Sequence, residues 1–263
     1  MSVVKKKNIF YNLWLNHEYI LYYAKIMLKT RVAGSYLGFL WLFIDPLMFM
    51  LIYSFIVMVV FRGKIEHFNV YVLIGITVWN LFSRAVMNAS TIIVRNKAIF
   101  EQVYFHKFVY PTILLISYIY EFLISIGLII FMMWIEKVPI TWHIFEIVPV
   151  LFTLALFSYG CSLITAHMGV YLFDLRNILD FTLKFVFYLT PIMWSFENFS
   201  SPIVGILKLN PMQVILGSFR CCLLYGKSPV YLYLFIISLF SCVLIQIGYT
   251  LISKKEDEYA RMI

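Results

Sequence analysis

The segment RNKAIFEQVYFHKFVYP, Arg95–Pro111, separates long apolar stretches with a short passage rich in charged and aromatic residues. The apolar side chains of Ile99 and Val103 are four residues apart, which places them on one face of a helix. Lys97 and Glu101 have the same spacing on another face, where they can form an ion pair. The segment therefore predicts an amphipathic helix that lies at a membrane surface and joins two spanning helices.

This connector, predicted to be helical over residues 95–108, has two interpretations. A helix that carries Lys, Glu and His between two spanning segments can bind a soluble partner, which could then push on both flanking helices. The alternative is a solvated connector such as any membrane protein can have, and the local pattern favours neither. The candidate partner-contacting residues are Lys97, Glu101, Gln102, Tyr104, His106 and Lys107.

The composition indicates a polytopic membrane protein. Hydrophobic residues make up 63% of the chain and charged residues 13%, and the mean hydropathy is +0.89, well above that of soluble domains. The net charge of +8 comes from Lys and Arg at the ends of apolar runs, which argues against a nucleic-acid-binding face. The four cysteines and five histidines lack metal-ligand spacing, so no metal site is expected.

The apolar runs predict an all-α fold with six transmembrane helices, because a helix needs about 20 apolar residues to cross the hydrocarbon core. The expected spans are residues 37–61, 70–94, 112–134, 145–173, 181–194 and 230–252. The fifth span is short for a full crossing. The charged residues from Asp174 to Asp180 are expected to form a tight turn before it.

Two further segments are expected beside these spans. Residues 1–36 place lysines and arginines among regularly spaced apolar positions, which predicts an amphipathic helix on the cytoplasmic surface. Residues 37–263 then form a single transmembrane domain. Within residues 195–226, Asn210 is a suitable N-cap and Pro211 a suitable first residue for a helix too short to span the membrane. This region is expected to be a re-entrant pair of half-length helices.

The distribution of basic residues predicts the orientation of the chain. Six spans place both termini on one side, and the excess of Lys and Arg identifies that side as the cytoplasm. That side carries Lys5, Lys6, Lys7, Lys25, Lys29, Arg31, Arg95, Lys97, Lys107, Arg176, Lys254, Lys255 and Arg261. The opposite side carries Arg62, Lys64, Lys137, Lys208, Arg220 and Lys227.

Several residues inside the spans are candidates for contact with a substrate. Arginine at the centre of a span is disfavoured by roughly 2.5–3.5 kcal/mol on insertion scales, so Arg84 must face an anionic substrate, a cavity or an internal ion-pair partner. Most aromatic residues belong to interfacial belts and packing. Flat rings beside hydroxyls and isolated charges also suit a sugar. The candidates on the first and fifth spans are Phe39, Phe43, Tyr53, Phe181, Lys184 and Tyr188.

The sequence carries no recognisable energy source or catalytic set of its own. Gly226-Lys227-Ser228 is similar to the end of a phosphate-binding loop, but Cys221 stands where that motif requires glycine. Paired carboxylates and Ser/His/Asp sets at catalytic spacing are also missing from the sequence. We therefore expect a transport subunit that is driven by another protein.

Short motifs spread over about residues 30–225 carry a resemblance to a known family. They are Tyr36-Leu37-Gly38-Phe39-Leu40-Trp41 with Pro46, Val103-Tyr104-Phe105 with Pro111, Asp174-Leu175-Arg176, Phe187-Tyr188-Leu189-Thr190-Pro191-Ile192, and Leu209-Asn210-Pro211 with Arg220. In this order they resemble the permease subunit of type 2 ABC exporters of cell-surface polysaccharide, which export O-antigen, teichoic acid or capsule. Asp45 departs from the Asn, Gln or Glu that many relatives carry before the proline.

The resemblance implies a transporter with two copies of this chain and two cytoplasmic ATPase subunits. ATP and Mg would be bound by those ATPase subunits, and this chain would hold no cofactor. A helix matching residues 95–108 would transmit the ATPase motion, while the first and fifth spans would line the path of a lipid-linked glycan. The resemblance also implies a cytoplasmic gate and an outer gate. Their candidate residues are Tyr23, Met27 and Arg31 for the first, and Pro191, Asn210, Pro211 and Arg220 for the second.

The expected function is that of the channel-forming subunit of an ATP-driven exporter in the bacterial inner (plasma) membrane. It would move a lipid-linked polysaccharide outward from the cytoplasm. One alternative is a permease of the same family that exports a drug or another lipid. Another is a membrane-embedded enzyme acting on lipid-linked sugars, which predicts turnover without ATP or a partner.

Overall fold

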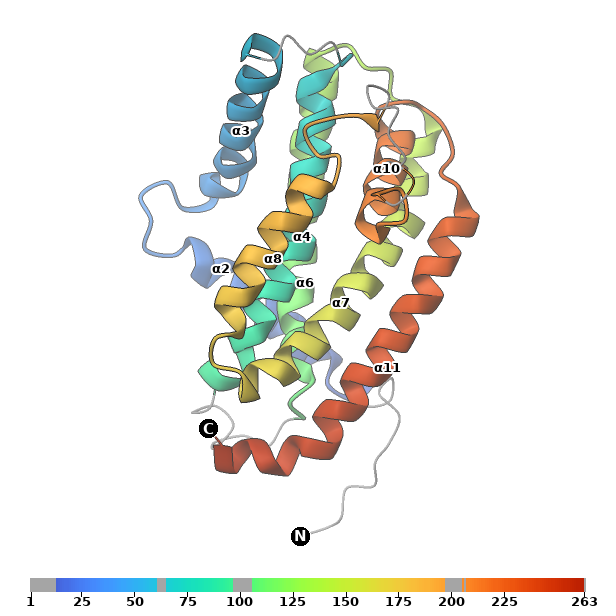
Figure 1. Ribbon diagram of the computed structural model, residues 1–263. Coiled ribbons are helices and arrows are strands. Elements are labelled where there is room, and N and C mark those ends of the chain that lie inside the picture. The colour runs from blue at the N-terminus through green and yellow to red at the C-terminus, as the bar shows by residue number, and fades with distance from the viewer. Residues whose placement is uncertain (1–12, 61–64, 97–105, 197–204, 206, 263) are drawn as a thin grey trace.

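The computed structural model describes residues 13–60, 65–96, 106–196, 205 and 207–262 (Figure 1). The chain is helical in these ranges, which confirms the predicted all-α fold. Short helical turns at Gly38–Leu40, Phe55–Val60 and Trp142–Glu146 adjoin the longer helices. The α-helices are α2 (His17–Val32), α3 (Trp41–Ser54), α4 (Phe68–Arg95), α6 (Val109–Ile135), α7 (Ile147–Tyr171), α8 (Leu175–Leu189), α10 (Pro211–Leu223) and α11 (Tyr231–Met262).

Five helices in the described part of the chain are long and apolar enough to cross a membrane. They are Gly38–Met58, Phe68–Arg95, Val109–Ile135, Trp142–Tyr171 and Tyr231–Glu256, which correspond to the first four expected spans and the last. Helix α8 has 15 residues. At about 1.5 Å per residue it is roughly 22 Å long, shorter than a hydrocarbon core of about 30 Å. The predicted count of six spans is thus not confirmed.

Helix α8 also begins earlier than the sequence suggested. The charged turn expected from Asp174 to Asp180 is wrong, because Asp174 occupies the N-cap position and the helix starts at the next residue. Asp180 forms an ion pair with Lys184 one turn later, with 2.6 Å between Oδ2 and Nζ, and such pairs stabilise a helix. The charges therefore belong to the first turns of α8. The helix ends just before Pro191, since a residue preceding proline disfavours the helical conformation.

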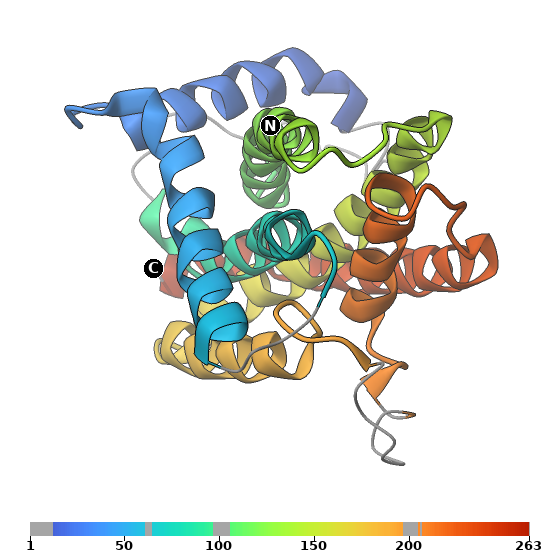
Figure 2. The same ribbon diagram turned by 90° about the horizontal axis from the view of Figure 1, so that it is seen from above.

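Helix α4 forms the centre of the bundle. Figure 2 shows it surrounded by α3, α6, α7 and α8, and each of these helices contacts it. In the apolar 18-residue stretch of α4, 78% of the residues are buried. The corresponding stretches of the helices that contain α3 and α11 are each 22% buried. The functional residues on α4 are therefore held by neighbours on all sides, whereas α3 and α11 leave large apolar faces uncovered in a single chain.

Small residues bring α7 into close contact with its neighbours. A Cβ atom added to Gly169 on α7 would lie 1.7 Å from the carbonyl oxygen of Ser90 on α4. Gly160 on α7 and Gly248 on α11 are similarly crowded, because an added Cβ would lie within 2.7 Å of a side-chain atom of the opposite helix. Small residues allow such close approach of helix backbones in membranes. Helices α4, α7 and α11 therefore pack as one unit.

Helix α2 lies across the bundle instead of along its axis (Figure 2). It packs against α6, and its residues Ile20 and Ala24 are buried while Lys25 and Lys29 are exposed. Residues 1–12 lie outside the described part, and both the amphipathic character of the segment and its place on a membrane surface stay predictions. Gly34 and Gly38, with φ values of 82° and 47°, connect α2 to α3. Such values favour glycine.

Candidate functional site

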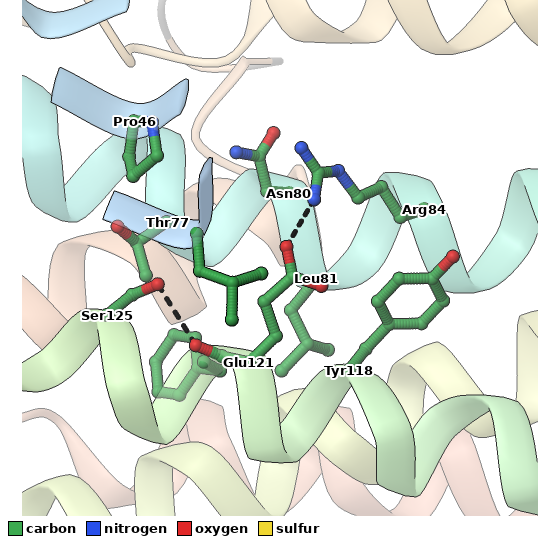
Figure 3. A pocket seen from close by; sticks show the side chains of 10 residues that line it. Pro46, Thr77, Asn80, Leu81, Arg84, Tyr118, Glu121 and Ser125 are labelled. Carbon is green, nitrogen blue, oxygen red and sulfur yellow. Dashed lines mark hydrogen bonds and ion pairs between the residues drawn. The ribbon is translucent and has the colours of Figure 1, made fainter. Parts of the chain in front are cut away.

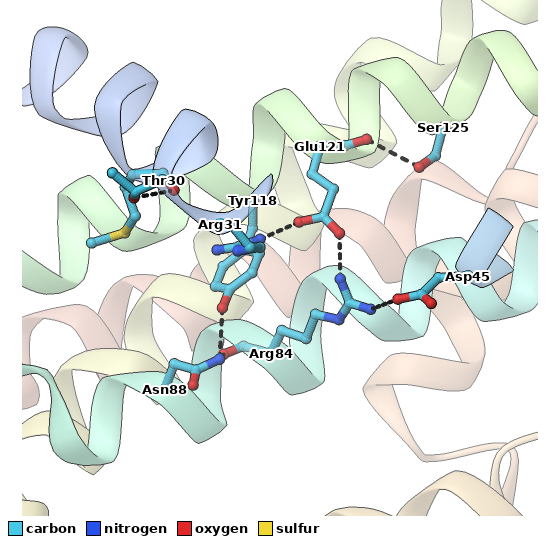
Figure 4. A network of polar contacts seen from close by, with 9 residues as sticks. Thr30, Arg31, Asp45, Arg84, Asn88, Tyr118, Glu121 and Ser125 are labelled. Carbon is cyan, nitrogen blue, oxygen red and sulfur yellow. Dashed lines mark hydrogen bonds and ion pairs between the residues drawn. The ribbon is translucent and has the colours of Figure 1, made fainter. Parts of the chain in front are cut away.

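Charged side chains from four helices meet at Glu121. Arg31 comes from α2, Asp45 from α3, Arg84 from α4 and Glu121 from α6 (Figure 4). The Glu121 carboxylate forms ion pairs with both Arg31 and Arg84, and Arg84 Nη2 lies 3.4 Å from Asp45 Oδ2. Only 13% of the Glu121 side chain is exposed. We call this cluster the Glu121 junction, and it holds two guanidinium groups around the largely covered carboxylate of Glu121, with the half-exposed Asp45 beside them.

Neighbouring aromatic and amide groups support the junction. The guanidinium carbon of Arg31 lies 4.3 Å from the centre of the Tyr118 ring, a cation–π contact. Asn88 donates hydrogen bonds to the Tyr118 hydroxyl at 2.6 Å and to the carbonyl oxygen of Arg84 at 3.0 Å. A cavity of about 20 Å³ between α3, α4 and α6 borders Glu121 (Figure 3). It has room for about one water molecule.

The junction answers one question that the sequence left open. Arg84 was expected to face a substrate, a cavity or an internal partner, and the structure gives it an internal partner in Glu121. Glu121 was not among the candidate site residues. The signal that could have identified it is a carboxylate inside one span and an arginine, Arg84, inside another. Sequence spacing could not connect these residues, because Glu121 is 37 positions from Arg84 and 90 positions from Arg31.

A second feature is a groove of about 440 Å³ between α3, α4 and α8, which we call the α8 groove. Of the expected path residues, the structure brings Tyr53, Arg84, Lys184 and Tyr188 together in its lining. Sequence reasoning missed further lining residues on the same helices. They are Phe49, Ile76, Trp79, Asn80, Ser83, Met87, Asn88, Arg176, Asp180, Leu183 and Phe187.

The two ends of the α8 groove differ in chemistry. Helices α4 and α8 run in opposite directions (Figure 1), so the start of α8 faces the later turns of α4. Arg176, Asp180 and Lys184 line the groove near the start of α8. Near the end of α8, the Phe187 ring lies 5.5 Å from the Trp79 ring and 6.0 Å from the Tyr53 ring. The groove therefore has a charged end and an aromatic end.

Three expected path residues lie elsewhere. Phe39 lines a separate groove of about 500 Å³ between α2 and α6, together with Lys25 and Tyr120. Phe43 packs edge-on against Phe39, with ring centres 5.9 Å apart. Phe181 is 73% exposed on α8 and does not line the α8 groove. The candidates of the first span are therefore separated, since Tyr53 lines the α8 groove and Phe39 lines the other groove.

Arg220 joins α10 to two other parts of the fold. It donates hydrogen bonds to the carbonyl oxygens of Pro191 at 2.7 Å, Ile192 at 3.0 Å and Tyr71 at 3.1 Å. Its guanidinium carbon lies 3.3 Å from the centre of the Tyr71 ring, and only 3% of the residue is exposed. Arg220, which the sequence counts among the basic residues of the outer side, is thus buried inside the protein, and its side of the membrane stays a prediction. Buried carbonyl oxygens, which need donors, hold it inside.

The other outer-gate candidates lie around this arginine. Asn210 caps α10 as predicted, because its side chain accepts a hydrogen bond from the Met212 backbone N–H at 3.0 Å and Pro211 begins the helix. The Asn210 amide also donates to the Thr190 hydroxyl at 3.0 Å. Helix α10 is therefore bound to the end of α8 at both of its own ends. Whether these residues move as a gate stays a prediction.

The cytoplasmic-gate candidates lie on α2 and follow one face of it. Tyr23 and Met27 are half-buried against the core, and the Tyr23 ring lies 4.2 Å from that of Tyr19. Arg31, on the last turn of the same helix, reaches the Glu121 junction. The described structure thus connects these candidates to α6, while their role as a gate remains a prediction.

Only the end of the connector belongs to the described residues. Lys97, Glu101, Gln102 and Tyr104 lie outside them, whereas His106 and Lys107 are described and precede α6. Lys107 is 8% exposed, so its side chain is not on the surface of this chain.

The described residues contain no group of three or more His, Cys, Asp or Glu side chains that could hold a metal ion.

The sequence is similar to that of known proteins. A family model described as ABC-2 type transporter matches residues 19–224, which include the Glu121 junction and the α8 groove. A protein named O-antigen export system permease protein RfbA from Myxococcus xanthus is 26% identical over 238 residues, covering 90% of this chain and 92% of the relative. A protein of the same name from Klebsiella pneumoniae is 24% identical over 255 residues, covering 96% and 98%.

Proposed function

This chain belongs to the ABC-2 type transporter family, and we propose that it is the channel-forming permease of a polysaccharide exporter. It is a multi-pass membrane transport subunit and not an enzyme. The observation that carries the proposed substrate is the α8 groove, in which aromatic rings lie beside charged and amide groups. Such a lining suits a sugar chain. The relatives named as O-antigen export permeases support a lipid-linked glycan as the cargo.

The energy for this transport comes from a separate ATPase, as in other ABC exporters. We place ATP and Mg on two cytoplasmic ATPase subunits that contact the connector at residues 95–108. The excess of basic residues on the side of the termini supports this orientation, with both termini in the cytoplasm beneath the bacterial inner membrane. Movement of the connector would then reach α4 and α6, which flank it in the chain.

A second copy of this chain is needed to close the path. Within one chain, Lys184 and Tyr188 in the α8 groove have 64% and 63% exposure, respectively. Helix α3 beside them carries Leu51 and Ile52, which are 56% and 48% exposed. Two such faces packed around a common axis would enclose the groove as a channel. We therefore propose a homodimer of this chain within the transporter.

Reversing the charge of the connector is expected to abolish export. Glu101→Arg would break the predicted docking of the ATPase while leaving the helices of the permease folded. The measurement is glycan export in cells together with ATP hydrolysis by the purified complex. Glu66→Arg is the matched control, because Glu66 has a 90% exposed side chain in a loop away from the connector. Normal export and normal permease-stimulated hydrolysis with Glu101→Arg would contradict the assignment of the connector.

Removing aromatic rings from the α8 groove is expected to slow export. Aromatic contacts are each worth about 0.5–1.5 kcal/mol, and 1.4 kcal/mol is about tenfold in an equilibrium or rate. We expect Tyr53→Ala with Tyr188→Ala to slow glycan export at least about fivefold at normal expression. Phe181→Ala with Phe185→Ala is the control, because both rings are largely exposed on α8 outside the groove. Equal slowing by both pairs would instead place the path over the outer face of α8.

A further inference from the structure

The C-terminal end of α11 extends past its spanning part and lies across the end of the bundle (Figure 1). The part of α11 that is apolar enough to cross a membrane ends at Glu256, and the helix continues to Met262. Tyr259 in this extension is 1% exposed, and its hydroxyl lies 2.5 Å from Nδ1 of His167 on α7. The extension is therefore packed against the bundle and fixed to α7.

Glu256 connects this part of α11 to the end of the connector. Its Oε1 atom accepts a hydrogen bond of 2.7 Å from the Lys107 backbone N–H, and its Oε2 atom lies 3.2 Å from His106 Nδ1. Only 13% of the Glu256 side chain is exposed. A carboxylate at this place also faces the N-terminal end of α6, where the helix dipole favours negative charge. One side chain thus holds two consecutive residues of the connector.

Aromatic packing reinforces the same contact. The His106 ring is stacked on Phe108, with centres 5.4 Å apart and planes inclined by 16°. Phe108 is 1% exposed and meets Tyr249 of α11 edge-on, with ring centres 5.1 Å apart. The orientation of His106 toward Glu256 is therefore set by packing, and a displacement of this segment would be felt by α11.

We propose that Glu256 is a positioning residue that ties the end of the connector to α11, so that a push on the connector moves α7 and α11 together with α4 and α6. This inference rests on the proposed role of the connector in coupling. The route includes α7 because Gly160 and Gly248 hold α7 and α11 in close contact. The sequence suggested only the two helices that flank the connector in the chain, whereas Glu256 is 149 positions from Lys107.

The charge state of His106 provides a readout of this contact. The hydrogen bond with Glu256 raises the pKa of His106, while burial and the charge of Lys107 act in the opposite direction. These two charged groups, one from α11 and one from the connector, are those that act on His106 among the described residues. Because the pKa is raised on folding, the contribution of the pair is fully present below the ordinary value of 6.5 and is lost as the pH rises through the raised value.

Hydrogen exchange in the complete transporter tests the inference. The permease is assembled with its ATPase subunits in lipid vesicles, and backbone exchange is compared with and without ATP and Mg. In the unaltered protein we expect nucleotide to change exchange in peptides from both the connector, 95–108, and the spanning part of α11. With Glu256→Ala we expect the connector to respond as before and the response of α11 to fall at least about threefold.

Two further variants separate positioning from simple loss of structure. Glu256→Gln keeps an acceptor for the Lys107 N–H but loses the charge opposite His106. We expect it to fold normally and the pH dependence of the α11 response to move to lower pH, because the interaction with Glu256 that raises the pKa of His106 is weakened. Glu258→Gln is the matched control, because that carboxylate accepts hydrogen bonds from Lys255 at 2.6 Å and from Tyr171 of α7 at 3.5 Å, whereas Glu256 bonds the connector.

The outcomes are distinguishable. A connector that does not respond to nucleotide in the unaltered complex would overturn the proposed coupling function itself. A connector that responds, with an undiminished α11 response in Glu256→Ala and an unchanged pH profile in Glu256→Gln, would overturn the role of Glu256 alone. If Glu256→Ala does not fold, the pH profile of Glu256→Gln decides the matter.

Discussion

Replacement of Arg220 by methionine is expected to lower the free energy of unfolding by about 3–5 kcal/mol, because three buried carbonyl oxygens lose their donor. The guanidinium is 3% exposed and supplies donors to the carbonyl oxygens of Tyr71, Pro191 and Ile192. Methionine fills a similar volume but donates no hydrogen bond. Each buried acceptor left unpaired costs about 1–3 kcal/mol. Equilibrium denaturation of the purified protein in detergent measures the difference.

Two comparisons test the cause of this loss. Arg220→Lys should be destabilised less, because lysine keeps the charge but cannot present several donors in a fixed plane. Arg176→Met on the exposed side of α8 should change stability by no more than about 0.5 kcal/mol, as is usual for surface substitutions. A stability of Arg220→Met within about 1 kcal/mol of the unaltered protein would show that the carbonyl groups find other donors.

Glu121→Gln is expected to be the second most damaging substitution, lowering the free energy of unfolding by about 2–3 kcal/mol. It removes the counter-charge that Arg31 and Arg84 share, and leaves Arg84 only the ion pair with the half-exposed Asp45. Removal of one partner from a fully buried pair costs about 3–5 kcal/mol. The side chains of Arg31 and Arg84 are 28% and 31% exposed, so solvent reduces the loss. Denaturation in detergent measures the effect.

Helix α2 should respond to the same change. Helix α2 is joined to Glu121 by the ion pair of Arg31. Glu121→Gln should therefore speed backbone hydrogen exchange in α2 more than in α7. Asp180→Asn is the control, because its ion pair with Lys184 is about half exposed and worth less than about 1 kcal/mol. An unchanged stability and unchanged exchange in α2 would show that the junction does not hold α2 on the bundle.

The Glu121 junction also relates two proposed parts of the transport mechanism. Arg31 belongs to the predicted cytoplasmic gate, and Arg84 both binds Glu121 and lines the α8 groove. Under the proposed function, an anionic group in the groove would compete with Glu121 for Arg84. Binding of the substrate in the groove and attachment of α2 to the bundle would then both involve the Glu121 side chain.

The sequence alone determined the features that depend on neighbouring residues. Hydropathy was sufficient for the helices at Phe68–Arg95 and Val109–Ile135, because burial in lipid demands an unbroken apolar run of a given length. Asn210 and Pro211 were sufficient for the start of α10, because an N-cap and a first-turn proline act within one helical turn. Ordered short motifs indicated the family.

Only the tertiary structure decided which side chains meet. A charged residue such as Arg84 inside a span needs a partner, but the sequence does not show that Glu121 and Asp45 are the residues that contact it. The burial of Arg220 was not evident from the sequence, because its partners are backbone carbonyls, which no side-chain pattern marks. The pairing of Glu256 with Lys107 depends on where α11 ends in space. Lipid tails are as apolar as the helix surfaces, so hydropathy does not favour one neighbouring helix over another. Close packing of side chains selects the neighbours instead.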